Sequence, residues 1–289
     1  MIDKAKCFTE AMRQLALEYN AKPEDFTANQ VTVTTPAKPD GVRLYSHEMP
    51  FFQMASTGNG VVITANEVLH PFLKEFTGDT ERFKHPYWLF ELPHLLCIER
   101  ELNKYDYTLS STFHMFLPGK PHKARVMPCA FTLKWFDKTS VKTLYPNTDF
   151  PNALSEKENP DRPDVLALAA YDGDEIAALA GASADTDALW QVGIDVKERY
   201  RGHGLGTTLV SLLCDRIEAL GKTPFYGTVL ANLHSQNIAL NTGFLPRVGG
   251  NIELQKGRNE RVNRNEFKVH HRDRCKRTQL KKYQCKAAA

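Results

Sequence analysis

The sequence predicts an α/β protein, in which strands and amphipathic helices alternate along the chain. Residues 189–196 are typical of a strand, because their apolar side chains fall on one face by the two-residue period. A glycine-rich turn leads from this strand into residues 205–220, whose apolar side chains recur at the spacing of one buried helical face. Residues 165–181 are typical of a β-hairpin that turns at 172–175. These segments together predict a sheet that is covered by helices.

The composition is that of a globular protein long enough for two domains, with 289 residues, 42% of them apolar and 25% charged. No apolar run approaches the roughly 18 residues that span a bilayer, and the N-terminus carries no signal-peptide pattern. We therefore expect a cytoplasmic protein with no membrane partner. The 6 cysteines are scattered, without a Cys-x-x-Cys pair, so the sequence predicts neither a disulfide framework nor a metal site.

Residues 1–122 predict a smaller N-terminal α/β domain. Its expected elements are a helix at 4–19, a strand at 60–65, helices at 66–76 and 93–105, and a strand at 107–117. A stretch at 118–121 that contains proline and glycine is the expected linker. This domain carries no phosphate loop and no catalytic cluster of residues.

Residues 123–250 predict a second domain. Besides the hairpin and the central strand, it has an expected strand at 131–136, a helix at 140–144, a surface loop at 155–163, a turn at 183–187 and a strand at 224–229.

Residues 251–289 predict a basic C-terminal extension, because they hold 12 Lys or Arg against 4 Asp or Glu, a net charge of +8. The remaining 250 residues hold 25 against 30, a net charge of −5. The extension has too few apolar residues for a core. Its charge permits a nucleic-acid contact, but no aromatic interleaving accompanies it, so we expect a solvated extension.

A cradle for a phosphate group is indicated between the central strand and the helix that follows it. Glycines at 202, 204 and 206 let the backbone approach an anion, while Arg199 and Arg201 supply positive charge. The start of the helix adds unpaired N–H groups and the positive end of its dipole. The pattern is not a dinucleotide fingerprint, because its third glycine comes too early, and no Gly-Lys-Ser/Thr follows as in a Walker loop.

The run Arg199-Tyr200-Arg201-Gly202-His203-Gly204-Leu205-Gly206 resembles the acyl-CoA pyrophosphate loop of the GNAT superfamily of N-acetyltransferases, whose core is Arg/Gln-x-x-Gly-x-Gly/Ala. The block at 232–244, which ends in Gly243-Phe244, resembles the next helix of the same family. The resemblance covers about residues 128–248. It implies a mixed, largely antiparallel central sheet flanked by helices, and by analogy the N-terminal domain is a degenerate copy of this fold.

The resemblance implies that acetyl-CoA is the acyl donor and that no metal takes part. The backbone of Ile194 and Val196 would pair with the pantetheine arm, with Gly193 helping the sheet to splay. The pyrophosphate would lie on the N–H groups of Arg201, Gly202, His203, Gly204, Leu205, Gly206 and Thr207, and the next helix would contribute Asn232, Ser235 and Asn237.

The implied reaction is direct attack of a primary amine on the thioester within a ternary complex, accelerated by positioning and by stabilisation of the oxyanion. Asp185 and Asp195 are the candidate bases, and the simpler alternative, which the sequence favours, is that Asp185 is a turn residue and Asp195 a solvated strand residue. Many family members carry a tyrosine as general acid near the position of Ala239, and Tyr226 is the candidate substitute. The acceptor is expected to be a small molecule rather than a protein.

Two other functions remain open. Without the usual acid, the domain could bind acyl-CoA as a non-catalytic sensor, and the basic extension could make the protein a nucleic-acid-associated acetyltransferase, although a nucleic-acid partner is not expected. The N-terminal domain is expected to shape the acceptor pocket or to mediate self-association as a homodimer.

Overall fold

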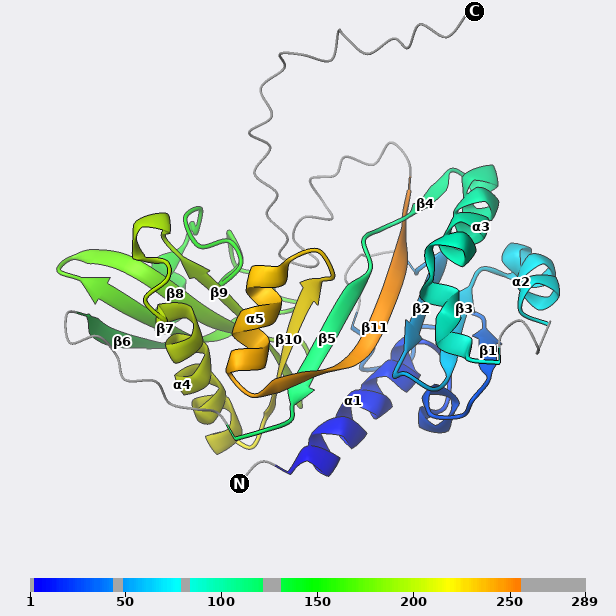
Figure 1. Cartoon of the computed structure of the whole chain (residues 1–289). Helices are drawn as coiled ribbons and strands as arrows, with labels where there is room; N and C mark the ends of the chain where they lie inside the picture. Colours follow the sequence, from blue (N-terminus) through cyan, green and yellow to red (C-terminus); the bar gives the residue numbers. More distant parts are fainter. Residues whose placement is uncertain (1–2, 44–48, 79–83, 122–130, 256–289) are drawn as a thin grey trace, which may run out of the picture.

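A computed structural model describes residues 3–43, 49–78, 84–121 and 131–255 of the chain. These residues form one 11-stranded sheet that extends across the whole molecule (Figure 1). The strand order is β1-β3-β2-β11-β5-β10-β9-β8-β7-β6, and β4 pairs with β11 beside this path. The strands are β1 (Val31–Thr34), β2 (Phe52–Ser56), β3 (Val61–Ala65), β4 (Tyr107–Leu109), β5 (Phe113–Pro118), β6 (Thr132–Asp137), β7 (Asp164–Asp172), β8 (Glu175–Ala184), β9 (Leu189–Val196), β10 (Thr223–Val229) and β11 (Phe244–Gln255).

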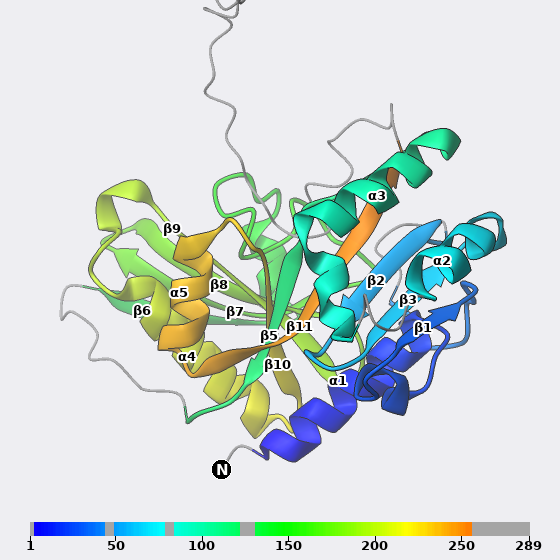
Figure 2. The same ribbon diagram turned by 45° about the vertical axis from the view of Figure 1, so that its right-hand side comes forward.

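The described strands pair mostly antiparallel, with parallel pairing between β1 and β3 and between β9 and β10. This confirms the predicted mixed, largely antiparallel sheet. Helices cover it, and Figure 2 shows them from a second direction. They are α1 (Lys4–Glu18), α2 (His70–Thr77), α3 (Leu92–Leu102), α4 (Leu205–Ala219) and α5 (Leu233–Asn241).

The alternation of side chains along the strands separates the core into two faces. On one face, α4 and α5 pack over β7 to β10 through a cluster that includes Leu209, Leu213 and Tyr226, and α2 and α3 pack over β2 and β3. On the other face, α1 packs against β5 and β10 through Leu15, Met115 and Phe225. The segment at 140–155 covers β7 and β8 on that same face. Both faces are therefore buried near the middle of the sheet.

The helix prediction at 4–19 is confirmed by α1, and the strand at 60–65 by β3. The single strand predicted at 107–117 was wrong, because the chain bends at the polar residues 110–112 and forms β4 and β5. Strand β4 pairs with the last residues of β11, and strand β5 pairs with its first part. The helix predicted at 140–144 is a 3-10 helix, Ser140–Leu144.

The sheet is continuous across the two predicted domains. Strand β5, from the first 122 residues, lies between β10 and β11 of the second range. Strand β11 extends to Gln255, beyond the predicted start of the basic extension at 251. The division at 122/123 and the idea of a degenerate N-terminal copy stay predictions. The rest of the extension, 256–289, lies outside the described residues.

Cys7, Cys97 and Cys214 are free thiols, and the other cysteines lie outside the described residues. In the part of the chain that the structure describes, no three His, Cys, Asp or Glu side chains are grouped so that they could hold a metal ion. No helix within the described ranges combines the length and apolar character needed to cross a membrane.

Candidate active site

The parallel strands β9 and β10 diverge in the middle of the sheet. Their pairing covers Leu189–Val192 of β9 and Thr223–Tyr226 of β10. Beyond these residues β9 continues to Val196 along β8, while β10 continues to Val229 along β5. The sheet therefore opens between the two strands directly after Val192 and Tyr226.

Gly193 lies at the start of this opening, and the chain's own backbone approaches it closely. A Cβ at this position would lie 1.8 Å from the carbonyl oxygen of Asn152. Asp195 holds the approaching segment, because its carboxylate accepts hydrogen bonds from the backbone N–H of Asn152 (2.6 Å), from Asn152 Nδ2 (2.6 Å) and from the N–H of Ala153 (3.0 Å). A glycine in a strand often marks such an approach, and here it allows the 152–153 backbone to pack on β9.

The glycine loop ends at α4, where Gly204 is the N-cap residue with φ +79°. This left-handed conformation favours glycine. No side chain caps the helix, so the N–H groups of its first turn point toward the loop together with the positive end of the helix dipole. Gly206 lets α4 approach its neighbours, because a Cβ there would lie 3.3 Å from Ile238 and 3.4 Å from Val196.

A groove of about 720 Å³ connects the opening with the glycine loop. Most of the predicted site residues line it: Ile194, Asp195, Val196, Arg201, Gly202, Gly204, Leu205, Gly206, Thr207, Tyr226, Asn232, Ser235 and Asn237. The lining includes Ile194 and Tyr226 from one face of the sheet, and Asp195 and Gly227 from the other. The groove therefore passes through the sheet between the diverging strands.

Two predicted site residues are not among those that line this groove. His203 is exposed on the loop. Asp185 is buried at 6% exposure, where it accepts a hydrogen bond of 2.7 Å from Ser183 Oγ and lies 4.0 Å from Arg162 Nη1. Its catalytic role stays a prediction, and these contacts give it a structural role in the turn before β9. Arg199, expected to supply charge, instead pairs with Glu175.

Tyr226 is the candidate acid that the structure brings into the groove. Its hydroxyl lies 2.8 Å from Ser235 Oγ, and burial raises the pKa of Tyr226 to about 12. The hydroxyl is therefore protonated at neutral pH, as an unburied tyrosine also is, and the raised pKa makes it a weaker acid than an exposed phenol. Ala239, near the position where relatives carry the usual tyrosine, is fully buried in the core.

Several side chains of the groove were not predicted as site residues, among them Asn152, Gln191, Tyr200, Thr228, His234 and Asn241. Thr228 follows Tyr226 by two residues in a strand, so the two-residue period could have indicated it. Asn152 lies in a segment without periodicity and could not be found in that way. Arg201 also acts within the chain, because its Nε donates a hydrogen bond of 3.1 Å to the carbonyl of Val196.

Diverging parallel strands beside a glycine loop that caps a helix define a site for an extended, phosphate-bearing ligand. A comparison with family models matches residues 131–244 to the acetyltransferase (GNAT) family. The matched range begins just before β6 and ends at the first residue of β11, and it contains the glycine loop. Residues 131–244 therefore form a domain of the acetyltransferase (GNAT) family, whose members are acyltransferases that use acyl-CoA.

Solved structures with a similar fold include a GCN5-related N-acetyltransferase-like protein from Streptococcus suis, at 17% identity and a TM-score of 0.40 over 57% of this chain and 69% of that one. A GCN5-related N-acetyltransferase from Kribbella flavida is 15% identical, with a TM-score of 0.40 over 56% of this chain and 64% of that one. No curated protein matches the chain significantly.

Proposed function

We propose that the protein is an N-acetyltransferase, which transfers the acetyl group of acetyl-CoA to a primary amine within a ternary complex. The observation that carries this proposal is the groove through the sheet, which joins the glycine loop to the opposite face between β9 and β10. Two substrates that enter from opposite faces would meet in the opening. Positioning of this kind supplies much of the rate acceleration in a reaction of two bound substrates.

The proposed donor site runs from the loop into the opening. Backbone N–H groups from Arg201 to Thr207 would hold the pyrophosphate, with the dipole of α4 adding to the attraction. The backbone of Ile194 and Val196, on the side of β9 that faces away from β8, would pair with the pantetheine arm. Asn232, Ser235 and Asn237 line the wall that α5 contributes.

In the proposed step, the nitrogen of a neutral amine attacks the thioester carbonyl carbon. A C–N bond forms, the C–S bond breaks, and the products are an acetamide and the free thiol of CoA. N–H groups at the opening would stabilise the negative charge that develops on the carbonyl oxygen. The proton lost by the amine goes to a base, and the departing sulfur takes a proton from an acid, so the reaction is balanced.

Tyr226 is the proposed acid, because it is among the residues that line the groove and its hydroxyl is protonated at neutral pH. Asp195 is the proposed base, since it lines the groove and Asp185 is not among its lining residues. Its two oxygens already accept three N–H groups, so we propose that it takes the proton through a water molecule.

The sensor remains a second candidate, because Ala239 is found near the position where relatives carry the usual acid. A nucleic-acid-associated acetyltransferase would depend on the basic extension, of which 256–289 lie outside the described residues. A small-molecule acceptor, a homodimer and a cytoplasmic location stay predictions.

Calorimetric titration of acetyl-CoA and CoA, followed by thiol release with a panel of primary amines, tests the proposal. We expect micromolar binding of both ligands and turnover with at least one class of amine. Binding without any turnover would favour the sensor, and no binding of either ligand would remove the acyl-CoA site.

A further inference from the structure

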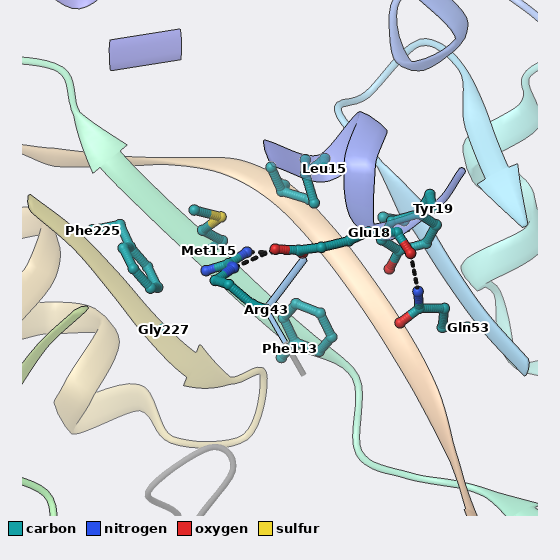
Figure 3. A pocket seen from close by; sticks show the side chains of 11 residues that line it. Leu15, Glu18, Tyr19, Arg43, Gln53, Phe113, Met115, Phe225 and Gly227 are labelled. Carbon is teal, nitrogen blue, oxygen red and sulfur yellow. Dashed lines mark hydrogen bonds and ion pairs between the residues drawn. The ribbon is translucent and has the colours of Figure 1, made fainter. Parts of the chain in front are cut away.

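A second, smaller pocket lies between the N-terminal elements and the central strands (Figure 3). Leu15 and Glu18 come from α1, Gln53 from β2, Phe113 from β5, and Phe225 from β10. Residues of both predicted domains thus form one cavity. Most of its wall is apolar, and Figure 3 shows the polar side chains gathered around Arg43 and Glu18.

This pocket and the groove share Gly227. Gly227 is the first residue of β10 after the pairing with β9 ends at Tyr226. It shares a face of the sheet with Phe225, and that is the face of Gly193 and Asp195. The pocket therefore lies beside the mouth of the groove on the face opposite to α4 and α5, where a molecule other than the acyl donor would enter.

The charged groups of the pocket neutralise one another. Arg43 and Glu18 form an ion pair in which Arg43 Nε and Nη2 both bind the carboxylate, the latter at 2.9 Å, and the side chains are only 4% and 9% exposed. The guanidinium carbon of Arg43 also lies 5.2 Å from the ring centroid of Phe225. Gln53 Nε2 donates to the backbone carbonyl of Glu18 at 2.9 Å. A further charge brought into this largely apolar site would have to lose its water without a dedicated counter-ion.

The pocket has a volume of about 50 Å³. Since a water-sized group needs about 10–15 Å³ of such space, there is room for about three or four non-hydrogen atoms. This is the size of a short alkyl group.

We propose that this pocket binds the uncharged, short aliphatic end of the acceptor amine, so that the substrate class is small alkyl amines whose nitrogen reaches the opening past Gly227. The proposal rests on the proposed function, because it names the acceptor of the same reaction. It gives the N-terminal elements a direct part in acceptor binding.

The test uses the full chain, acetyl-CoA, and primary n-alkylamines from ethylamine to hexylamine. For the wild type, kcat/KM should rise about fourfold with each methylene that enters the pocket and then fall once the pocket is full. Pentylamine should exceed 1,4-diaminobutane and 4-aminobutanoate, which place a charge at the far end, by at least about tenfold.

Two variants change the size of the pocket in opposite directions. Val248→Ala widens it and should move the preferred amine one carbon longer, while Ala55→Val narrows it and should move it one carbon shorter. Val62→Ala is the matched control, because Val62 is buried in the same cluster and is not among the residues that line the pocket. Calorimetric titration of the alkylamines into the CoA-bound protein should give the same order without turnover.

Two results would overturn the role of the pocket in acceptor binding while acetyl-CoA binding persists. One is a preference for amines with a charged far end over the alkyl amines. The other is a chain-length order that neither Val248→Ala nor Val62→Ala changes. Absence of acetyl-CoA binding in the wild type would instead overturn the proposed function itself.

Discussion

The hydroxyl of Tyr226 on β10 lies 2.8 Å from the Oγ of Ser235 on α5, in the wall of the groove. Burial raises the pKa of this hydroxyl to about 12, above the usual value of 10.0. The hydrogen bond joins the strand at the opening to the helix that lines the groove, and either hydroxyl can be its donor.

Replacement of Tyr226 by Phe removes the proposed acid and little else. We expect kcat with acetyl-CoA to fall at least about 100-fold, the usual contribution of general acid catalysis, while the calorimetric Kd of acetyl-CoA changes by less than about twofold. Ser235→Ala is the control, since it keeps the phenol and should lower kcat far less. An unchanged kcat in Tyr226→Phe would assign protonation of the sulfur to water.

Gly204 has φ +79° at the start of α4. In Gly204→Val, a β-branched side chain is forced into the left-handed region at a cost of about 1–2 kcal/mol and reaches the groove that Gly204 lines. We expect the calorimetric Kd of acetyl-CoA to rise more than about 100-fold. Gly221→Val is a matched control, because Gly221 has φ +74° and open space around it beyond the other end of α4. Equal loss of affinity in both variants would show a general effect on the helix.

Gly193 supports the 152–153 segment, because a Cβ there would lie 1.8 Å from the carbonyl oxygen of Asn152. Gly193→Ala must displace this backbone, and we expect the free energy of unfolding in urea to fall by about 3 kcal/mol or more. In Gly249→Ala the new Cβ would lie 3.7 Å from the nearest atom, on His114, so the free energy of unfolding should fall by only about 1 kcal/mol. Similar losses for both variants would contradict the packing described for Gly193.

The sequence predicted the glycine loop, β9, β10 and most of the groove, because these features depend on local patterns of glycine and apolar residues. Strand β11 was not predicted, since it contains Pro246, Gly249 and Gly250 and its register shifts between Pro246 and Val248. Only its pairing with β5, β2 and β4 identifies it as a strand. The contact of Asn152 with Asp195 and the pocket around Arg43 likewise bring together residues far apart in the chain, where periodicity carries no information.

The buried imidazole of His114 on β5 should lower the free energy of unfolding in acid. Its Nδ1 is buried without a hydrogen-bond partner among the described residues, and burial lowers the pKa of His114 below its usual value of 6.5. The unfolded chain then binds a proton at a higher pH than the folded protein. Stability is therefore fully present above pH 6.5 and is lost as the pH falls through the lowered value.

Thermal unfolding of the wild type and of His114→Leu between pH 7.5 and pH 5 measures this contribution. We expect the melting temperature of the wild type to fall further than that of the variant over the range, because the variant lacks the imidazole. Parallel curves would show that His114 is protonated equally in both states.

Strand β11 continues to Gln255, where it pairs with β2 at Gly249–Ile252 and with β4 at Glu253–Gln255. A chain that ends at Gln255 keeps these pairs and removes most of the basic extension. We expect it to bind acetyl-CoA as tightly as the full chain and to unfold at the same urea concentration. A chain that ends at residue 250 loses ladder hydrogen bonds worth about 0.5–1.5 kcal/mol each, so its free energy of unfolding should fall by about 2–5 kcal/mol.

The chain that ends at Gln255 also tests the nucleic-acid alternative, because counter-ion release makes nucleic-acid binding steeply dependent on salt. Duplex DNA bound by the full chain with a steep salt dependence, and not by the chain ending at Gln255, would favour a nucleic-acid-associated acetyltransferase. We expect no such difference, since no recognised nucleic-acid-binding motif accompanies the basic residues of 256–289.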